Sequence, residues 1–129
     1  MARKLEIAWE CKMQRIEGAM GQVDYYRYNL AGVLTAACEF KDRSVGGNAY
    51  ATYPSVYMAL RKWVALQLIS MALDPLGLFV VQYTDCLCWV DVNEIGVTKV
   101  IRGGRYDRPG VENDVEPIIE VPVTKLHVI

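Results

Sequence analysis

Apolar and polar positions repeat along the chain with periods that predict both strands and helices. From Lys4 to Lys12, apolar residues alternate with mostly charged ones, the period-two pattern of a strand with one buried face. Between Asn29 and Phe40, apolar residues recur at the spacing of a helix face, although the preceding Val23–Tyr28 stretch has strand propensity. We predict a helix over 29–40, but Gly32 weakens it, so helix and strand both stay open for residues 23–40.

The clearest element is a helix that follows Thr52-Tyr53-Pro54-Ser55 and ends at Leu73. Hydroxyl side chains and an early proline suit a helix start. The few polar residues inside this segment do not cover one clean face. The helix is therefore predicted to be buried on most sides.

The second half of the chain predicts strands. Residues 79–92 form a long run with apolar residues on both faces, and the turn 93–96 predicts a hairpin with a strand over 97–101. Pro117 and Pro122 cannot donate to a sheet, so the segment 111–129 is expected to be an edge strand or an extended arm. The fold class is α+β: a mostly antiparallel sheet packed against one long and one shorter helix, in a single compact domain over 1–129.

Composition narrows the classes of function. When glycine is counted in place of tyrosine, apolar residues make up about 54% of the 129 residues, a modest excess over the usual share of about 45–50%, and in a small domain such a surplus favours an interface. A net charge of −1 gives no overall attraction to nucleic acid or to an anionic membrane. The N-terminus lacks a secretory signal, and Asp74-Pro75 and Gly77 interrupt the apolar run, so we expect a cytoplasmic protein without a membrane span.

The cysteines offer the first candidates for chemistry. Cys86 and Cys88 would share one face of a strand and could reach one metal, but two small side chains in a sheet core explain the same spacing. A thiol enzyme using His127 lacks a glycine-rich elbow for its nucleophile. We therefore expect reduced cysteines, no metal, no cofactor and no catalytic residue, and the sequence leans away from an enzyme without deciding the question.

A loop rich in arginine and glycine is the most suggestive local stretch. Its guanidinium groups and one aromatic ring could hold a phosphate and stack on a base. The alternative to a binding site is a solvated loop whose arginines pair with nearby acidic residues. The candidate ligand-binding residues are Arg102, Arg105, Tyr106 and Arg108.

A cluster of tyrosines is compatible with partner binding, because tyrosine is enriched at interfaces. The candidate interface residues are Tyr25, Tyr26, Tyr28, Tyr53 and Tyr57. The leading hypothesis is a non-enzymatic interaction or assembly subunit, homo-oligomeric or bound to another protein, and an accessory protein of a phage or mobile element would fit. The alternative is a module that binds a small anion or nucleic acid through the arginine-rich loop 102–109. Neither hypothesis includes a membrane partner.

Overall fold

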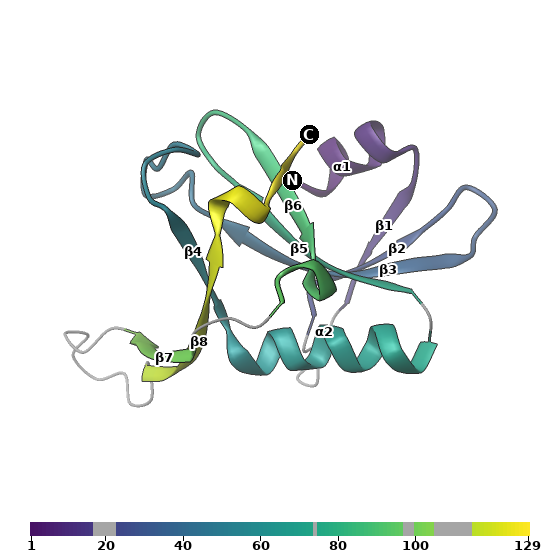
Figure 1. Ribbon diagram of the computed structural model, residues 1–129. Coiled ribbons are helices and arrows are strands. Elements are labelled where there is room, and N and C mark those ends of the chain that lie inside the picture. The colour runs from purple at the N-terminus through teal and green to yellow at the C-terminus, as the bar shows by residue number, and fades with distance from the viewer. Residues whose placement is uncertain (17–22, 74, 97–99, 105–114) are drawn as a thin grey trace.

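Two β-sheets and two α-helices make up the part of the chain that the computed structural model describes, residues 1–16, 23–73, 75–96, 100–104 and 115–129 (Figure 1). The α-helices are α1 (Ala2–Trp9) and α2 (Leu60–Leu73), and short 3-10 helices cover Val92–Glu94 (η1) and Val123–Lys125 (η2). The strands are β1 (Lys12–Arg15), β2 (Tyr25–Tyr28), β3 (Leu34–Asp42), β4 (Ser55–Ala59), β5 (Leu76–Gln82), β6 (Leu87–Asp91), β7 (Val100–Gly104), β8 (Val115–Pro122) and β9 (His127–Val128).

The larger sheet has the strand order β1-β2-β3-β5-β6-β9, and the smaller sheet has the order β4-β8-β7. β3 and β5 are parallel, and the other neighbours in both sheets are antiparallel. Parallel neighbours need a long crossover, which β4 and α2 provide here. The α+β class is therefore confirmed, and the main sheet, predicted as mostly antiparallel, is mixed because it contains one parallel pair.

The two α-helices lie on opposite faces of the larger sheet (Figure 1). α2 packs on β3 and β5, with Leu66 fully buried. On the other face, Leu5 of α1 is buried with Ala36 and Cys38 of β3. Because side chains alternate along a strand, Ala37 of β3 belongs instead to the core on the α2 side.

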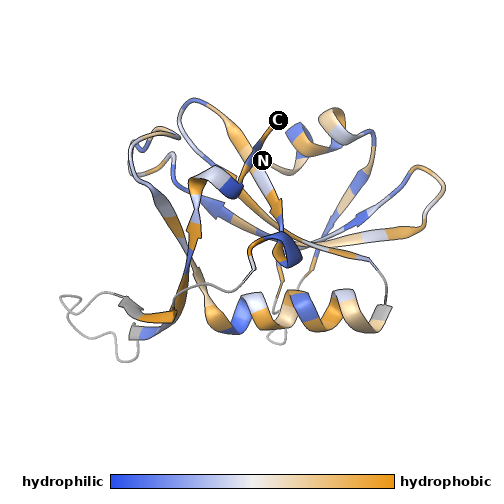
Figure 2. Cartoon of the chain, viewed as in Figure 1, coloured by the Kyte–Doolittle hydropathy of each residue, from blue (hydrophilic) through white to orange (hydrophobic). Residues whose placement is uncertain are grey.

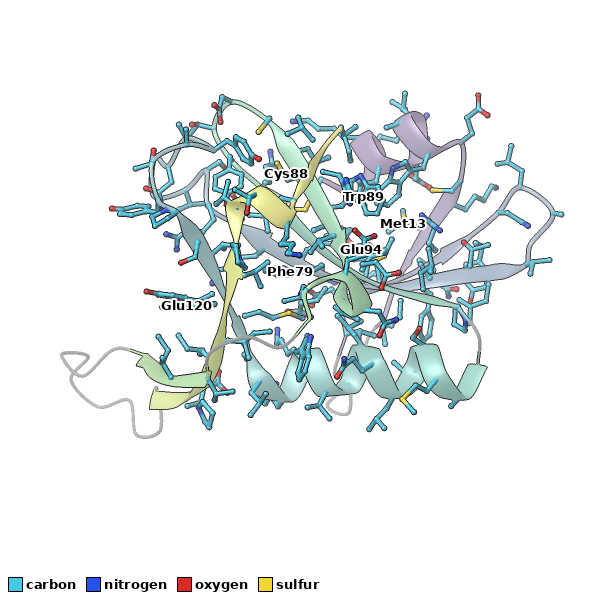
Figure 3. All side chains as sticks on the ribbon, viewed as in Figure 1. Met13, Phe79, Cys88, Trp89, Glu94 and Glu120 are labelled. Atoms are coloured by element: carbon cyan, nitrogen blue, oxygen red, sulfur yellow. The ribbon has the colours of Figure 1, made fainter. Side chains whose placement is uncertain are left out.

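Apolar clusters lie on both sides of the main sheet. Figure 2 shows hydrophobic segments in its strands and in both helices. Phe79 and Cys88 belong to the core on the α2 side, and Trp89 lies beside α1, where its ring meets that of Trp9 edge to face at 6.0 Å between centroids (Figure 3). α2 is not buried on most sides as predicted, because Val64, Leu68 and Met71 are 40%, 59% and 81% exposed. The helix packs through one face only.

Two predictions in the first third of the chain are wrong. The segment predicted as a strand over 4–12 contains helix α1, because Met1, Leu5 and Trp9 lie four residues apart and all pack on the sheet. The predicted helix over 29–40 is mainly strand β3, joined to β2 by a turn. In that turn Asn29 Oδ1 accepts the backbone N–H of Ala31 and Val33, each at 3.0 Å.

Four later predictions also differ from the structure. Residues 55–59 are strand β4 rather than the start of the helix, and the long strand predicted over 79–92 is two antiparallel strands, β5 and β6. β7 pairs with β8 in the smaller sheet and not with β6, so the hairpin predicted around 93–96 is wrong. β8 is the middle strand of the smaller sheet rather than an edge strand or arm, with Pro122 at its last position, while β9 lies at the edge of the larger sheet.

Candidate functional site

Glu39 is the one buried charged side chain in the described part of the molecule, with 4% of its surface exposed. It lies on β3, on the face that α2 covers, because it follows Ala37 by two residues. Lys41 follows by another two and shares this face. A strand buried among apolar neighbours thus carries a carboxylate and an ammonium group side by side.

Asp24 reaches the same place from the position just before β2. β2 and β3 are antiparallel neighbours, and the Asp24 N–H donates to the Cys38 carbonyl oxygen at 3.0 Å. The Asp24 side chain accepts the N–H of Phe40 through Oδ2 at 2.9 Å. This bond holds the Asp24 carboxylate at the backbone between Glu39 and Lys41.

Two lysines complete the cluster. Lys62, in the first turn of α2, donates to Oε1 of Glu39 in a close ion pair. Lys41 Nζ donates to the Tyr57 carbonyl oxygen of β4 at 2.5 Å. These four residues come from β3, from α2 and from the position before β2. They are here called the carboxylate–lysine cluster: Asp24, Glu39, Lys41 and Lys62.

Burial perturbs the charged groups of the cluster. It raises the pKa of Glu39 to about 7, while the hydrogen bond and charge of Lys62 act in the opposite direction and the charge of Asp24 adds to the rise. Burial lowers the pKa of Lys41 to about 8, helped by the cations Arg43 and Lys62 and opposed by Glu39. Perturbed carboxyl and amino groups gathered in one place are typical of functional sites.

The carboxylates fit a divalent cation. Oε2 of Glu39 is buried and has no hydrogen-bond partner among the described residues, an arrangement that is costly unless something satisfies the oxygen. Mg²⁺ is commonly held by one or two protein carboxylates and keeps several waters, and Asp24 and Glu39 supply two. Within the described ranges no group of three or more His, Cys, Asp or Glu side chains could hold a metal, so a cation here would take its other ligands from water or substrate.

The arginine-rich loop predicted from the sequence lies mostly outside the described residues. Arg105, Tyr106 and Arg108 are not described, and the backbone of Arg102 belongs to β7, opposite Pro117 of β8. The four residues stay a prediction.

The predicted interface tyrosines divide into two groups. Tyr25 stacks on Phe40 with centroids 4.6 Å apart, and Tyr26 packs against the core on the α2 side. Tyr28 is half-buried, and Tyr53 and Tyr57 are 55% and 45% exposed. An interface role for them stays a prediction.

The four cysteines are free thiols, and the Sγ atoms of Cys86 and Cys88 lie 3.6 Å apart. His127 Nε2 bonds to Glu94 Oε2 at 2.8 Å, and its ring lies 4.5 Å from that of Trp89. No described helix is long and apolar enough to cross a membrane.

A helix over 29–40 does not predict the carboxylate–lysine cluster, because it ends at Phe40 and leaves Lys41 outside it. In a strand, by contrast, residues 39 and 41 share one face. The signal was present as a single glutamate in the apolar run Leu34–Phe40, followed two residues later by lysine. A lone charge in a buried strand needs a partner or a function.

A family model described as "Phage putative PDDEXK endonuclease" matches residues 1–129 of the chain. Searches of curated proteins and of solved structures gave no match.

Proposed function

The chain belongs to the phage PDDEXK endonuclease family, and we propose that it hydrolyses phosphodiester bonds of nucleic acid at the carboxylate–lysine cluster. The match over the whole chain overturns the hypothesis of a non-enzymatic assembly subunit, while the link to phage agrees with the family's description. The letters EXK in the family's name are matched by Glu39, Phe40 and Lys41.

The observation that carries this proposal is the buried Glu39 with one unsatisfied oxygen beside Asp24. Asp24 and Glu39 would hold a divalent cation such as Mg²⁺. When bound, such a cation stabilises negative charge on a phosphoryl oxygen and makes a bound water more acidic. The amide of Phe40 holds the Asp24 carboxylate and Lys62 holds that of Glu39, so both are oriented before any ligand arrives.

Lys41 supplies positive charge on the same face. Its ammonium group stabilises the negative charge that develops on the phosphate as a water attacks phosphorus and the ester oxygen leaves. The Tyr57 carbonyl holds Lys41 in position from β4, so the smaller sheet also shapes the site.

We also propose that Arg102, Arg105, Tyr106 and Arg108 help to bind the nucleic acid. Arg102 belongs to β7, in the same sheet as β4, which contacts Lys41 through Tyr57. The chain has a net charge of −1, so attraction to phosphate must be local to such groups. The free thiols support the cytoplasm as the location of this activity.

Cleavage of plasmid and linear DNA with Mg²⁺, with and without EDTA, tests the proposal. Asp24→Asn and Glu39→Gln should each lower the cleavage rate by at least about a hundredfold, because each removes a charged ligand. Glu94→Gln is the matched control, since its carboxylate is 47% exposed and bonds to His127, and it should leave the rate unchanged. A Glu39→Gln variant that cleaves at the wild-type rate would refute the proposed site.

A further inference from the structure

Lys62 stands where a positively charged residue is unfavourable for the helix that carries it. It is the third residue of α2, whose first turn holds two cations and no acidic side chain. The N-terminus of a helix is electropositive, so lysine in this turn does not stabilise the helix. Its position is better explained by its partner, Glu39.

The two members of this ion pair are exposed to different degrees. The Glu39 side chain is 5% exposed, so its carboxylate cannot turn to water, whereas the Lys62 side chain is 28% exposed. A lysine has a long flexible stem, so its ammonium group can move while its backbone stays in the helix. Lys41, by contrast, donates to the Tyr57 carbonyl.

A buried carboxylate needs a positive partner, and in the metal-free protein Lys62 is that partner. A divalent cation bound to Asp24 and Glu39 would supply the same charge and would repel an ammonium group beside it. The two cations therefore compete for one carboxylate. The displaced ammonium group would then be free to pair with a substrate phosphate that the cation holds.

We propose that Lys62 is an exchangeable counter-ion: it pairs with Glu39 in the metal-free protein, yields this carboxylate to the divalent cation, and then binds a phosphate of the nucleic acid. The inference rests on the proposed function, because it needs the cation site and the substrate. It predicts that removing the charge of Lys62 strengthens the binding of the divalent cation and weakens the binding of DNA. A merely structural role of Lys62 would not produce these opposite effects.

Calorimetric titration with Mn²⁺ at about pH 8, above the pKa of about 7 that burial gives Glu39, tests whether Lys62 competes with the cation. Lys62→Gln keeps a hydrogen-bond donor for Glu39 but removes the charge, so Mn²⁺ should bind at least about threefold more tightly than to wild type. Arg61→Gln is the matched control: it removes a cation from the same turn whose exposed ion pair with Glu116 measures 3.0 Å, and Mn²⁺ affinity should not change.

A DNA-binding measurement tests whether the displaced Lys62 binds a phosphate of the substrate. With Ca²⁺ present, Lys62→Gln should bind a labelled DNA duplex more weakly than wild type, and the salt dependence of binding should fall by about one phosphate contact. Tighter Mn²⁺ binding together with weaker DNA binding supports the exchange. Unchanged or weaker Mn²⁺ binding in Lys62→Gln overturns it.

A stability measurement gives an independent readout. Lys62→Met leaves Glu39 without a partner, so Mn²⁺ should raise its melting temperature by more than it raises that of wild type. If Lys62→Met does not fold without metal, Lys62→Gln carries the test. If wild type does not bind Mn²⁺, or if Glu39→Gln binds Mn²⁺ as tightly as wild type does, the proposed function fails as well. Mn²⁺ binding by wild type without the predicted effects of Lys62 substitutions refutes only the exchange.

Discussion

Gly77 of β5 lets helix α2 lie close to the main sheet, and replacing it with alanine should force the two apart. A Cβ atom at position 77 would lie 2.9 Å from the backbone oxygen of Leu66, 3.1 Å from the Leu66 Cβ and 3.0 Å from Cγ2 of Val92. The Leu66 atoms belong to the body of the helix rather than to the flexible end of a side chain. The added methyl group can therefore be accommodated only if α2 or β5 shifts.

The expected loss in the free energy of unfolding follows from the size of this overlap. Overpacking a dense core by a methyl group lowers the free energy of unfolding by about 1–3 kcal/mol. The lower chain entropy of alanine in the unfolded state offsets about 0.4–1 kcal/mol of this. We expect a net loss of about 1–2 kcal/mol for Gly77→Ala, which corresponds to a melting temperature lower by about 4–8 °C in a domain of this size.

Urea unfolding followed by tryptophan fluorescence measures this loss. Gly46→Ala is the matched control, because the nearest atom to its added Cβ is Asn48 Nδ2 at 3.6 Å, and its stability should be unchanged or slightly higher. If Gly77→Ala unfolds within about 0.5 kcal/mol of wild type, the argument from close packing is wrong. Lys62 lies one turn before Leu66, so Gly77→Ala should also slow DNA cleavage while the protein is still folded.

Two further predictions concern the core. Leu66→Ala should lower the free energy of unfolding by about 2–5 kcal/mol because Leu66 is fully buried. Leu68→Ala should change it little because Leu68 is 59% exposed. Chemical denaturation of both variants checks this contrast. Burial raises the pKa values of Tyr83 and Cys88 to about 12, from 10.0 and 9.0, so the folded protein keeps protons that the unfolded chain releases. The stability contributed by these groups is complete below about pH 9 and should fall as the pH rises toward 12. Tyr83→Phe should reduce this alkaline loss in urea titrations, and an equal loss in both proteins would count against the assignment.

The α+β class and the end of the long helix at Leu73 could be predicted from the sequence. The helix boundary is marked locally by Asp74-Pro75, and the later strands are rich in β-branched and aromatic residues. Local signals of this kind depend only on residues within a few positions of one another. They can therefore be interpreted without knowledge of the tertiary structure.

The segments at the N-terminus and over 29–40 could not be decided locally. Met1, Leu5 and Trp9 have helical spacing, but the intervening apolar residue Ile7, which is 67% exposed, makes the same segment look like a strand. In β3 both faces are buried, so its apolar run lacks the alternation that would distinguish a strand from a helix.

The sequence by itself determined the residue types that the candidate site needs, including a glutamate separated from a lysine by one residue. Only the tertiary structure decided that Glu39 and Lys41 share a face, that pairing with β2 brings Asp24 to them, and that packing of α2 adds Lys62. The reason is physical: a local sequence pattern sets short-range backbone preferences, whereas the burial and charge of Glu39 depend on β2 and α2, which lie at distant positions in the chain.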